Sequence, residues 1–212
     1  MRQKLFLLFT GLLTLQIAVA DDGLYTPTVI PSREEILKIH NDDIVIGCKD
    51  AKHLIIEYSS LSCPHCAHYY QNTFPKIKAE IINKCKAKYV LRDFPTTKSA
   101  LKGTAVAHCL AKSDNKIDSE QFFTFIQLLF NSQQTWAFSN DYESNLSKIF
   151  SIAGISQDKI TECMSDKDLM YEIVSRSFID MKALNMTRSP SIFIDGVEIP
   201  MATFDAINDA VK

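Results

Sequence analysis

The spacing of apolar residues predicts alternating strands and helices in the first half of the chain. Residues 53–58 form a short, nearly continuous apolar run, which is typical of a buried strand. A helix is expected to begin at Cys63 and to be interrupted near Pro75, because a proline there removes a backbone hydrogen bond. Residues 88–94 predict a further strand. A strand, a helix and a strand in this order predict parallel strands joined by a right-handed crossover.

Further elements are expected at the two ends of this unit. Ser32 and Glu35 have the spacing of a capping box and predict a helix that continues to about residue 40, followed by a first strand at 43–46. Near the end of the chain, Asp195-Gly196 separates two short runs rich in β-branched residues, which predicts a hairpin with a type I′ turn. The expected strands are 191–194 and 197–199, and the expected last helix is 203–211.

Helical spacing replaces the strand signal between residues 99 and 184, which predicts an all-helical insertion. In its last segment, five apolar residues fall on one helical face and are interpreted as core: Met170, Ile173, Val174, Met181 and Leu184. The expected helices are 101–111, 120–130, 141–152, 157–164 and 168–184.

Composition places the chain among globular proteins. Its 212 residues are 46% hydrophobic and 23% charged, which suffices for one domain that carries an insertion. The net charge is -2 and the basic residues are scattered, so no nucleic-acid partner is expected.

The N-terminus has the pattern of a secretory signal peptide, residues 1–20. Arg2 and Lys4 precede an apolar stretch at 5–15, and Ala18-Val19-Ala20 fits a cleavage site. The alternative is an uncleaved membrane anchor, but the run is shorter than the ~20 residues that span a bilayer, and Gln16 interrupts it. We therefore expect export to a periplasmic space, which permits disulfides among the six cysteines that follow.

The motif Cys63-Pro64-His65-Cys66 carries the candidate chemistry. A C-x-x-C pair between a strand and a helix predicts a redox site. Cys63 is expected at the N-cap and Pro64 at the first helical position. The helix dipole and a partly protonated His65 then favour the Cys63 thiolate and lower its pKa, so the Cys63–Cys66 disulfide should be a strong oxidant. Cys66 is expected to be its buried partner.

Two other classes of protein compete with this interpretation. Cys63, Cys66 and His65 or His68 could bind zinc, as C-x-x-C pairs often do. No second C-x-x-C or H-x-x-x-H accompanies them, so no metal is expected, and no other cofactor. The pair could also be a structural disulfide of a binding or chaperone module. A structural bond would not give a hyperreactive Cys63.

Cys48 and Cys85 each precede the N-terminal end of one of the two strands predicted to be parallel neighbours. The topology therefore predicts that they lie close together. They could form a disulfide, or remain two buried thiols that behave as small hydrophobes.

The order of these features resembles the DsbA family of exported thiol-disulfide oxidoreductases. The resemblance rests on Cys63-Pro64-His65-Cys66, on Glu57 six residues earlier, on Leu91-Arg92-Asp93-Phe94-Pro95 and on Ser189-Pro190. It implies an α/β protein, a thioredoxin fold with an inserted all-helical domain. The implied division is a thioredoxin-like part at 21–97, the insertion at 98–186 and the remaining thioredoxin-like part at 187–212.

The resemblance also implies roles for single residues. Pro190 would be a cis-proline that packs against the redox pair, and the backbone of Ser189 would bind an extended substrate. Glu57 would lie beneath the site, handle the proton of Cys66 and have a raised pKa; alternatively, period-two alternation points it to solvent. Some relatives carry a second disulfide inside the insertion, which Cys109 and Cys163 resemble; the alternative is again two free thiols.

The expected function is the introduction of disulfides into reduced or misfolded exported proteins, with a membrane redox partner that reoxidises the enzyme. The alternative within the same chemistry is a disulfide isomerase or reductase. Ser189 stands where the best-known DsbA oxidases carry valine, which leaves this alternative open. Isomerases of this broad family often oligomerise through an added N-terminal segment, whereas only a short one precedes the first strand here, so a monomer is expected.

Overall fold

The computed structural model describes residues 30–114 and 116–212 of the chain. The expected signal peptide at 1–20 lies outside the described residues, so it stays a prediction. Within the described ranges, no helix combines the length and the apolar character needed to cross a bilayer.

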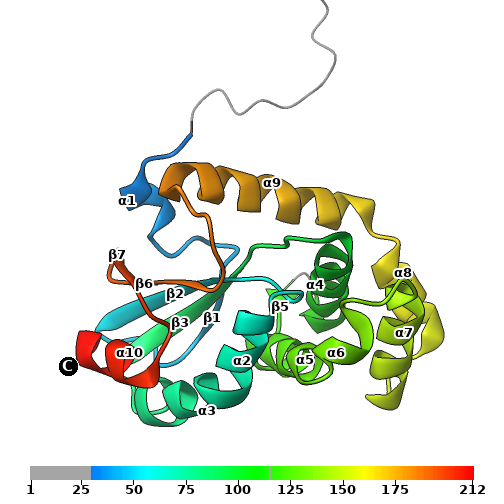
Figure 1. Cartoon of the computed structure of the whole chain (residues 1–212), viewed down its shortest axis with the longest axis horizontal. Coiled ribbons are helices and arrows are strands. Elements are labelled where there is room, and N and C mark those ends of the chain that lie inside the picture. Colours follow the sequence, from blue (N-terminus) through cyan, green and yellow to red (C-terminus); the bar gives the residue numbers. More distant parts are fainter. Residues whose placement is uncertain (1–29, 115) are drawn as a thin grey trace, which may run out of the picture.

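A five-stranded mixed sheet forms the centre of the fold, with the strand order β1-β3-β2-β6-β7 (Figure 1). Strands β2 and β3 are parallel, and the other neighbouring pairs are antiparallel. Helices cover both faces of these two central strands, which explains why they read as apolar runs. The strands are β1 (Ile44–Ile46), β2 (His53–Ser59), β3 (Ala87–Asp93), β6 (Ser191–Ile194) and β7 (Val197–Ile199).

The predicted parallel pairing of β2 and β3, with helices between them in the chain, is confirmed. The chain leaves β2 through α2 (Pro64–Asn72), α3 (Phe74–Ile77) and a π-helical turn, η1 (Lys78–Ile82), and returns parallel in β3. The expected interruption near Pro75 falls between α2 and α3. Pro75 is the second residue of α3, where a missing N–H removes no helical hydrogen bond.

The predicted C-terminal hairpin is also confirmed. Asp195 and Gly196 have φ angles of 49° and 85°, as a type I′ turn requires at both central positions. The last helix, α10 (Phe204–Ala210), begins after Thr203, whose hydroxyl accepts a hydrogen bond from the N–H of Ala206.

Six helices lie between β3 and β6, beside one end of the sheet, and α9 runs back across it (Figure 1). The fold class expected from the sequence, a thioredoxin fold with a helical insertion, is confirmed by this order. The residue boundaries assigned to the insertion stay a prediction. The six helices are α4 (Lys98–Ala111), α5 (Ser119–Asn131), α6 (Gln133–Trp136), α7 (Tyr142–Ile152), α8 (Gln157–Met164) and α9 (Lys167–Leu184).

The sheet separates two apolar layers. Residues of β2 alternate between them, with Ile55 packed in the larger core that includes α2, α4 and α5, and Ile56 in the smaller core that includes α1 (Arg33–Ile36) and α9. Trp136 is fully buried in the larger core, and its indole N–H donates to the carbonyl of Leu129 at 3.0 Å. Trp136 is therefore a packing residue of the inserted helices.

A buried charged cluster joins α9 to the sheet. The guanidinium of Arg92 pairs with Asp43 at 2.8 Å, and both side chains are almost inaccessible to solvent. Arg92 also donates to the hydroxyl of Tyr58, which in turn donates to Asp180 of α9. Burial would raise the pKa of Asp43, but the hydrogen bonds and charge of Arg92 outweigh it and lower that pKa. Arg176 of α9 pairs with the same carboxylate.

Two expectations about the secondary structure are wrong, one about where a helix ends and one about the absence of strands from the insertion. The first helix, expected to reach residue 40, ends at Ile36, because buried Arg92 takes the carbonyls of Ile36 and Lys38 that a longer helix would use. The insertion is not purely helical, since β4 (Lys112–Ser113) and β5 (Lys116–Ile117) form a small hairpin. Strands of two residues are too short to show an alternating pattern.

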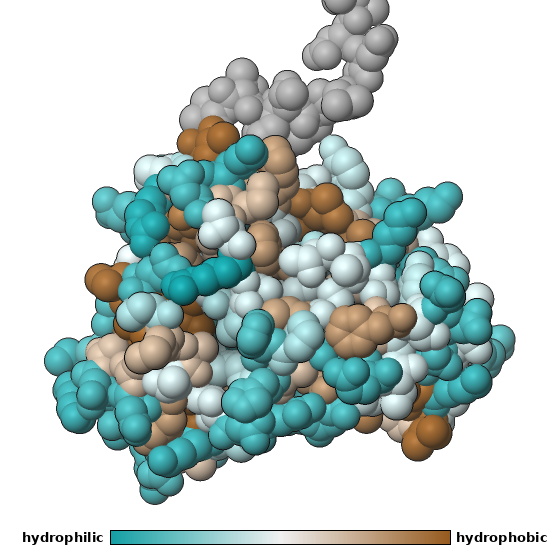
Figure 2. Space-filling view, in the orientation of Figure 1, coloured by the Kyte–Doolittle hydropathy of each residue, from teal (hydrophilic) through white to brown (hydrophobic). Residues whose placement is uncertain are grey.

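The core face assigned to α9 is partly wrong. Val174 is 45% exposed, whereas Ile173 and Leu184 are buried together with Ser177 and Asp180. These two polar residues lie on the buried face, so apolar spacing alone gave the wrong rotation of the helix. Figure 2 shows apolar patches scattered among polar residues on one face of the molecule.

Candidate active site

Cys63 lies where β2 gives way to α2. A tight turn, in which the N–H of Cys63 donates to the carbonyl of Ser60 at 3.0 Å, places Cys63 at the N-cap. Pro64 occupies the first helical position. The sulfur of Cys63 accepts a hydrogen bond from the N–H of Cys66 at 3.3 Å. The N-cap side chain of this helix is therefore a thiol, with backbone donors directed at it.

The surroundings of Cys63 favour its thiolate. Its pKa is lowered to about 5, chiefly because the Cys66 thiol donates a hydrogen bond to its sulfur. The side chain of Ser189 and the backbone N–H groups of Cys66 and His65 act in the same direction and outweigh partial burial. The His65 side chain is exposed, so what His65 supplies to the sulfur here is its backbone N–H.

Cys66 has the opposite environment. It is fully buried in the first turn of α2, and both cysteines are free thiols. Burial raises the pKa of Cys66, and its hydrogen bond to Cys63 and the charge of Glu57 raise it further. One thiol of the pair is thus accessible and acidic, and the other is inaccessible and held protonated.

Glu57 lies in β2 beneath this pair and has no exposed surface. The interpretation that alternation turns it toward solvent is wrong, because α2 covers this face of the sheet. The hydroxyl of Tyr89 donates to its carboxylate. Burial raises the pKa of Glu57 to about 7, although the hydrogen bond from Tyr89 and the nearby hydroxyls of Ser59 and Tyr70 oppose the rise.

The polar groups around Glu57 are incompletely paired. Among the described residues, four buried side-chain atoms lack a hydrogen-bond partner, and three of them, Glu57 Oε1, Ser59 Oγ and the Tyr70 hydroxyl, belong to this cluster. Ser59 acts on the Cys66 thiol as well, since its hydroxyl lowers the pKa of Cys66. The cluster therefore contains proton donors and acceptors next to the buried thiol.

Ser189 and Pro190 approach Cys63 from the other side, just before β6. The peptide bond between them is cis. The Cys63 thiol donates to the carbonyl of Ser189 at 3.2 Å. Residues 126 positions apart in sequence thus meet at one sulfur atom. The structure brings together the candidate residues Glu57, Cys63, Pro64, His65, Cys66, Ser189 and Pro190 at one end of the sheet.

Gln133 contacts the same loop and was missed in the sequence. It is 2% exposed, and its side-chain amide donates to the carbonyls of Leu61 and Cys63 at 2.8 and 3.0 Å. Gln133 begins α6, a helix of four residues that the apolar spacing did not predict. A lone glutamine in a polar run carries no signal that distinguishes it from a surface residue.

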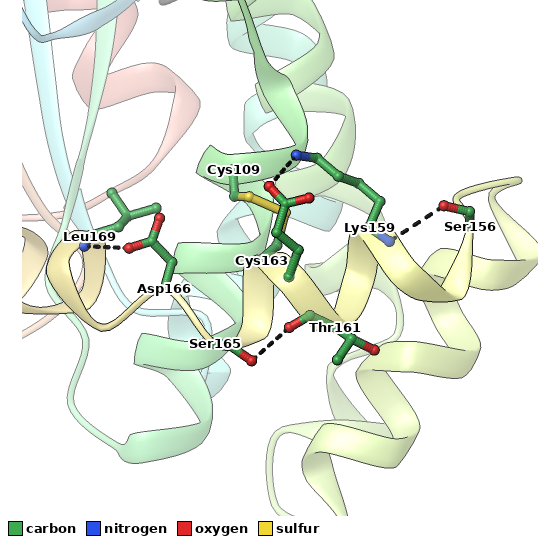
Figure 3. Close-up of a disulfide and its surroundings, with 9 residues drawn as sticks. Cys109, Ser156, Lys159, Thr161, Cys163, Ser165, Asp166 and Leu169 are labelled. Atoms are coloured by element: carbon green, nitrogen blue, oxygen red, sulfur yellow. Dashed lines mark hydrogen bonds and ion pairs between the residues drawn. A yellow bond between two sulfur atoms is a disulfide. The ribbon is translucent and has the colours of Figure 1, made fainter.

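The other four cysteines form two disulfides. Cys48 pairs with Cys85 beside the N-terminal ends of β2 and β3, with a Cα–Cα distance of 5.1 Å. Cys109 of α4 pairs with Cys163 of α8, with a Cα–Cα distance of 5.5 Å (Figure 3). Both pairings lie away from the redox pair. In Figure 3, Ser156 caps the N-terminus of α8 by accepting from the N–H of Lys159, and Asp166 caps the N-terminus of α9 by accepting from the N–H of Leu169.

Three of the four histidines outside the motif, His40, His53 and His108, have side-chain partners. His53 pairs with Asp195 at 2.7 Å, and His108 with Asp93 at 2.6 Å. His40 contacts the carbonyl of Glu35 at 3.1 Å. These contacts give the three side chains structural roles away from the redox pair.

A cavity and the arrangement of potential metal ligands were compared with the position of the redox pair. A cavity of about 440 Å³ borders the Arg92 cluster, between β1, β3 and α9, and neither Cys63 nor Cys66 lines it. In residues 30–114 and 116–212, no three histidine, cysteine or acidic side chains converge as they would around a metal ion.

The sequence and the fold of this chain are similar to those of known proteins. Residues 40–212 match a family model described as thioredoxin. A protein of Rickettsia typhi, provisionally assigned as a protein-disulfide oxidoreductase, is 33% identical over 174 residues, which cover 82% of this chain and 62% of the relative. The chain spans only 60–65% of the length of the five rickettsial relatives that it matches.

Two further similarities extend beyond Rickettsia. Disulfide bond formation protein D of Bacillus subtilis is 25% identical over 173 residues, which cover 79% of this chain and 75% of that protein. The crystal structure of Wolbachia pipientis alpha-DsbA1 superposes with a TM-score of 0.77 at 29% identity, and covers 85% of this chain and 94% of that one.

Proposed function

This chain belongs to the thioredoxin family, and on that premise we propose that it is a DsbA-like enzyme that introduces disulfides into exported proteins. The observation that carries the proposal is the contrast between two neighbouring thiols. Cys63 is accessible with a pKa near 5, whereas Cys66 is buried with a raised pKa. A structural disulfide or a zinc site does not require such a contrast.

The reaction begins with the Cys63–Cys66 disulfide. A substrate thiolate attacks the sulfur of Cys63, the bond between the two cysteines breaks, and Cys66 leaves as a thiolate that takes up a proton. Glu57 is the nearest carboxyl and, with a pKa of about 7, is partly protonated at neutral pH. We assign it as the donor of that proton.

The second step releases the substrate. Another substrate thiol loses its proton and attacks the substrate sulfur of the mixed disulfide, so that the substrate disulfide forms and Cys63 leaves as a thiolate. Two electrons pass from the substrate to the enzyme. Cys63 is a good leaving group because the hydrogen bonds to its sulfur stabilise the thiolate.

The direction of transfer follows from the same asymmetry. Groups that stabilise the Cys63 thiolate act only on the reduced enzyme, so they make its disulfide oxidising. This supports an oxidase over an isomerase or reductase. We assign the carbonyl of Ser189, which already accepts a hydrogen bond from Cys63, to the binding of an extended substrate segment next to the cis peptide.

The proposal extends to the setting of the reaction. We propose that residues 1–20 direct export to the periplasm, that a membrane protein reoxidises the Cys63–Cys66 pair, and that the enzyme acts as a monomer. Two disulfides outside the redox pair support an oxidising compartment. The provisional assignments of the rickettsial relatives agree with the chemistry, although this chain matches only part of their length.

One pair of assays separates an oxidase from its alternatives. The equilibrium constant of the Cys63–Cys66 couple with glutathione, and the rate of oxidation of a reduced dithiol peptide, should both show a strong oxidant. A Cys63→Ser variant is the control without the nucleophile. Efficient unscrambling of a misoxidised protein with little dithiol oxidation would indicate an isomerase instead. Slow alkylation of Cys63 at pH 5 would indicate a structural disulfide or a zinc site.

A further inference from the structure

Gln133 is a polar side chain from the inserted helices that is buried against the loop of the redox pair. Its Nε2 atom donates to the carbonyls of Leu61 and Cys63 at 2.8 and 3.0 Å. An amide nitrogen has two hydrogens, so these two bonds use its whole donor capacity. The two acceptors also fix which end of the amide faces the loop, because the oxygen would meet two other oxygens there.

The other end of the same side chain is unsatisfied. Gln133 Oε1 is buried without a hydrogen-bond partner, which opposes folding. An apolar side chain of similar length would fill this space without an unpaired oxygen. The two donations to the loop are therefore what distinguishes glutamine from methionine at this position.

The two carbonyls belong to the turn that sets the orientation of Cys63. A hydrogen bond from the N–H of Cys63 to the carbonyl of Ser60 closes this turn. The carbonyl of Cys63 also accepts from the N–H of Ala67 in the first turn of α2. Without Gln133, the carbonyl of Leu61 would lose the side-chain donor that holds it in a buried place.

We propose that Gln133 is a positioning residue for Cys63, through which the inserted helices set the oxidising strength of the Cys63–Cys66 couple. It holds the turn in the arrangement that directs the N–H of Cys66 at the sulfur. Its amide hydrogens also offset the negative ends of two carbonyl dipoles next to the thiolate. The inference rests on the proposed function, because it concerns the strength of the same redox pair.

The test compares Gln133→Met with a matched control. Gln127 also lies in the insertion, is partly buried, and donates its Nε2 to a backbone carbonyl, that of Tyr70 in α2, at 3.3 Å. Gln127→Met therefore removes an amide-to-carbonyl bond between the same two parts of the protein without touching the loop of Cys63. The stability of each variant is measured beside its redox properties, because the two glutamines differ in the number of carbonyls they bind.

Only Gln133→Met should change the redox properties. The Cys63 pKa, followed by thiolate absorbance at 240 nm in the reduced protein, is expected to rise by about one unit in this variant. The equilibrium with glutathione should shift about tenfold toward the disulfide, which corresponds to ~30 mV. Gln133→Asn keeps an amide one methylene shorter, so it should shift both quantities less, and it replaces Gln133→Met if that variant does not fold.

Two results would overturn the inference. The first is a Gln133→Met protein with wild-type Cys63 pKa and glutathione equilibrium but lower stability, which would leave Gln133 a purely structural role. The second is an equal redox change in Gln127→Met. Failure of the proposed function looks different: the wild-type protein would not oxidise dithiol peptides, while the Cys63 pKa of the variants would still report on Gln133.

Discussion

Glu57→Gln tests whether ionisation of the buried carboxyl beneath the redox pair lowers the free energy of unfolding. In the folded protein its pKa is about 7, against an ordinary value of 4.5. The folded protein therefore binds more protons than the unfolded chain between these two values, and its stability falls as the pH rises through this window. A difference of this size corresponds to about 3 kcal/mol above pH 7.

Glutamine removes the titration and fits the same space. Tyr89 can still donate to its carbonyl, and the unpaired hydroxyl oxygens of Ser59 and Tyr70 can accept from its amide. Relative to the wild type, Glu57→Gln should be nearly equal in stability at pH 4.5 and more stable by about 3 kcal/mol at pH 8. For a chain of this length, the melting temperature would differ by roughly 6–12 °C.

The assay is chemical unfolding of the reduced protein at several pH values between 4.5 and 8. Glu80→Gln makes the same chemical change at an exposed position of η1 and is the control. A stability difference between Glu57→Gln and the wild type that is the same at all pH values would refute the reasoning. So would a variant that is less stable than the wild type at pH 8.

Three further outcomes follow from the same geometry. Alkylation of reduced Cys63 by iodoacetamide should rise around pH 5 and be level above pH 7, because the thiolate is the nucleophile; a midpoint above pH 8 would contradict this. Replacing both Cys109 and Cys163 by alanine should lower the free energy of unfolding by roughly 4 kcal/mol in urea, since their bond spans 54 residues; unchanged stability would count against it. Tyr89→Phe removes a donor to Glu57, so the Glu57 pKa should rise, measured from its carboxyl 13C shift, and a fall would oppose the assignment.

Local sequence signals predicted the elements that position the redox pair. The apolar run of β2, the proline after Cys63 and the Asp195-Gly196 turn each depend on neighbouring residues, so they can be read from a short window. The resemblance added what spacing could not supply, such as the meeting of Ser189 with Cys63. The buried position of Glu57 also required knowledge of which face α2 covers.

The missed features depend on contacts between distant segments. Gln133 reaches the redox loop from 70 residues away, and nothing near it in sequence marks that contact. Asp180 turns its carboxylate toward the sheet because Tyr58 and Arg92 offer partners there, and Ser177 is buried on the same face of α9. Polar residues usually mark the exposed face of a helix, but these two are buried. The apolar spacing therefore predicted a different orientation of α9.

The Arg92 cluster connects the start of the insertion to its end. Arg92 lies at the end of β3, just before the inserted helices begin, and its partner Asp180 lies near their end in α9. The entry and the exit are thus fastened at one point. A change that removes either side chain should therefore loosen the start and the end of the insertion together.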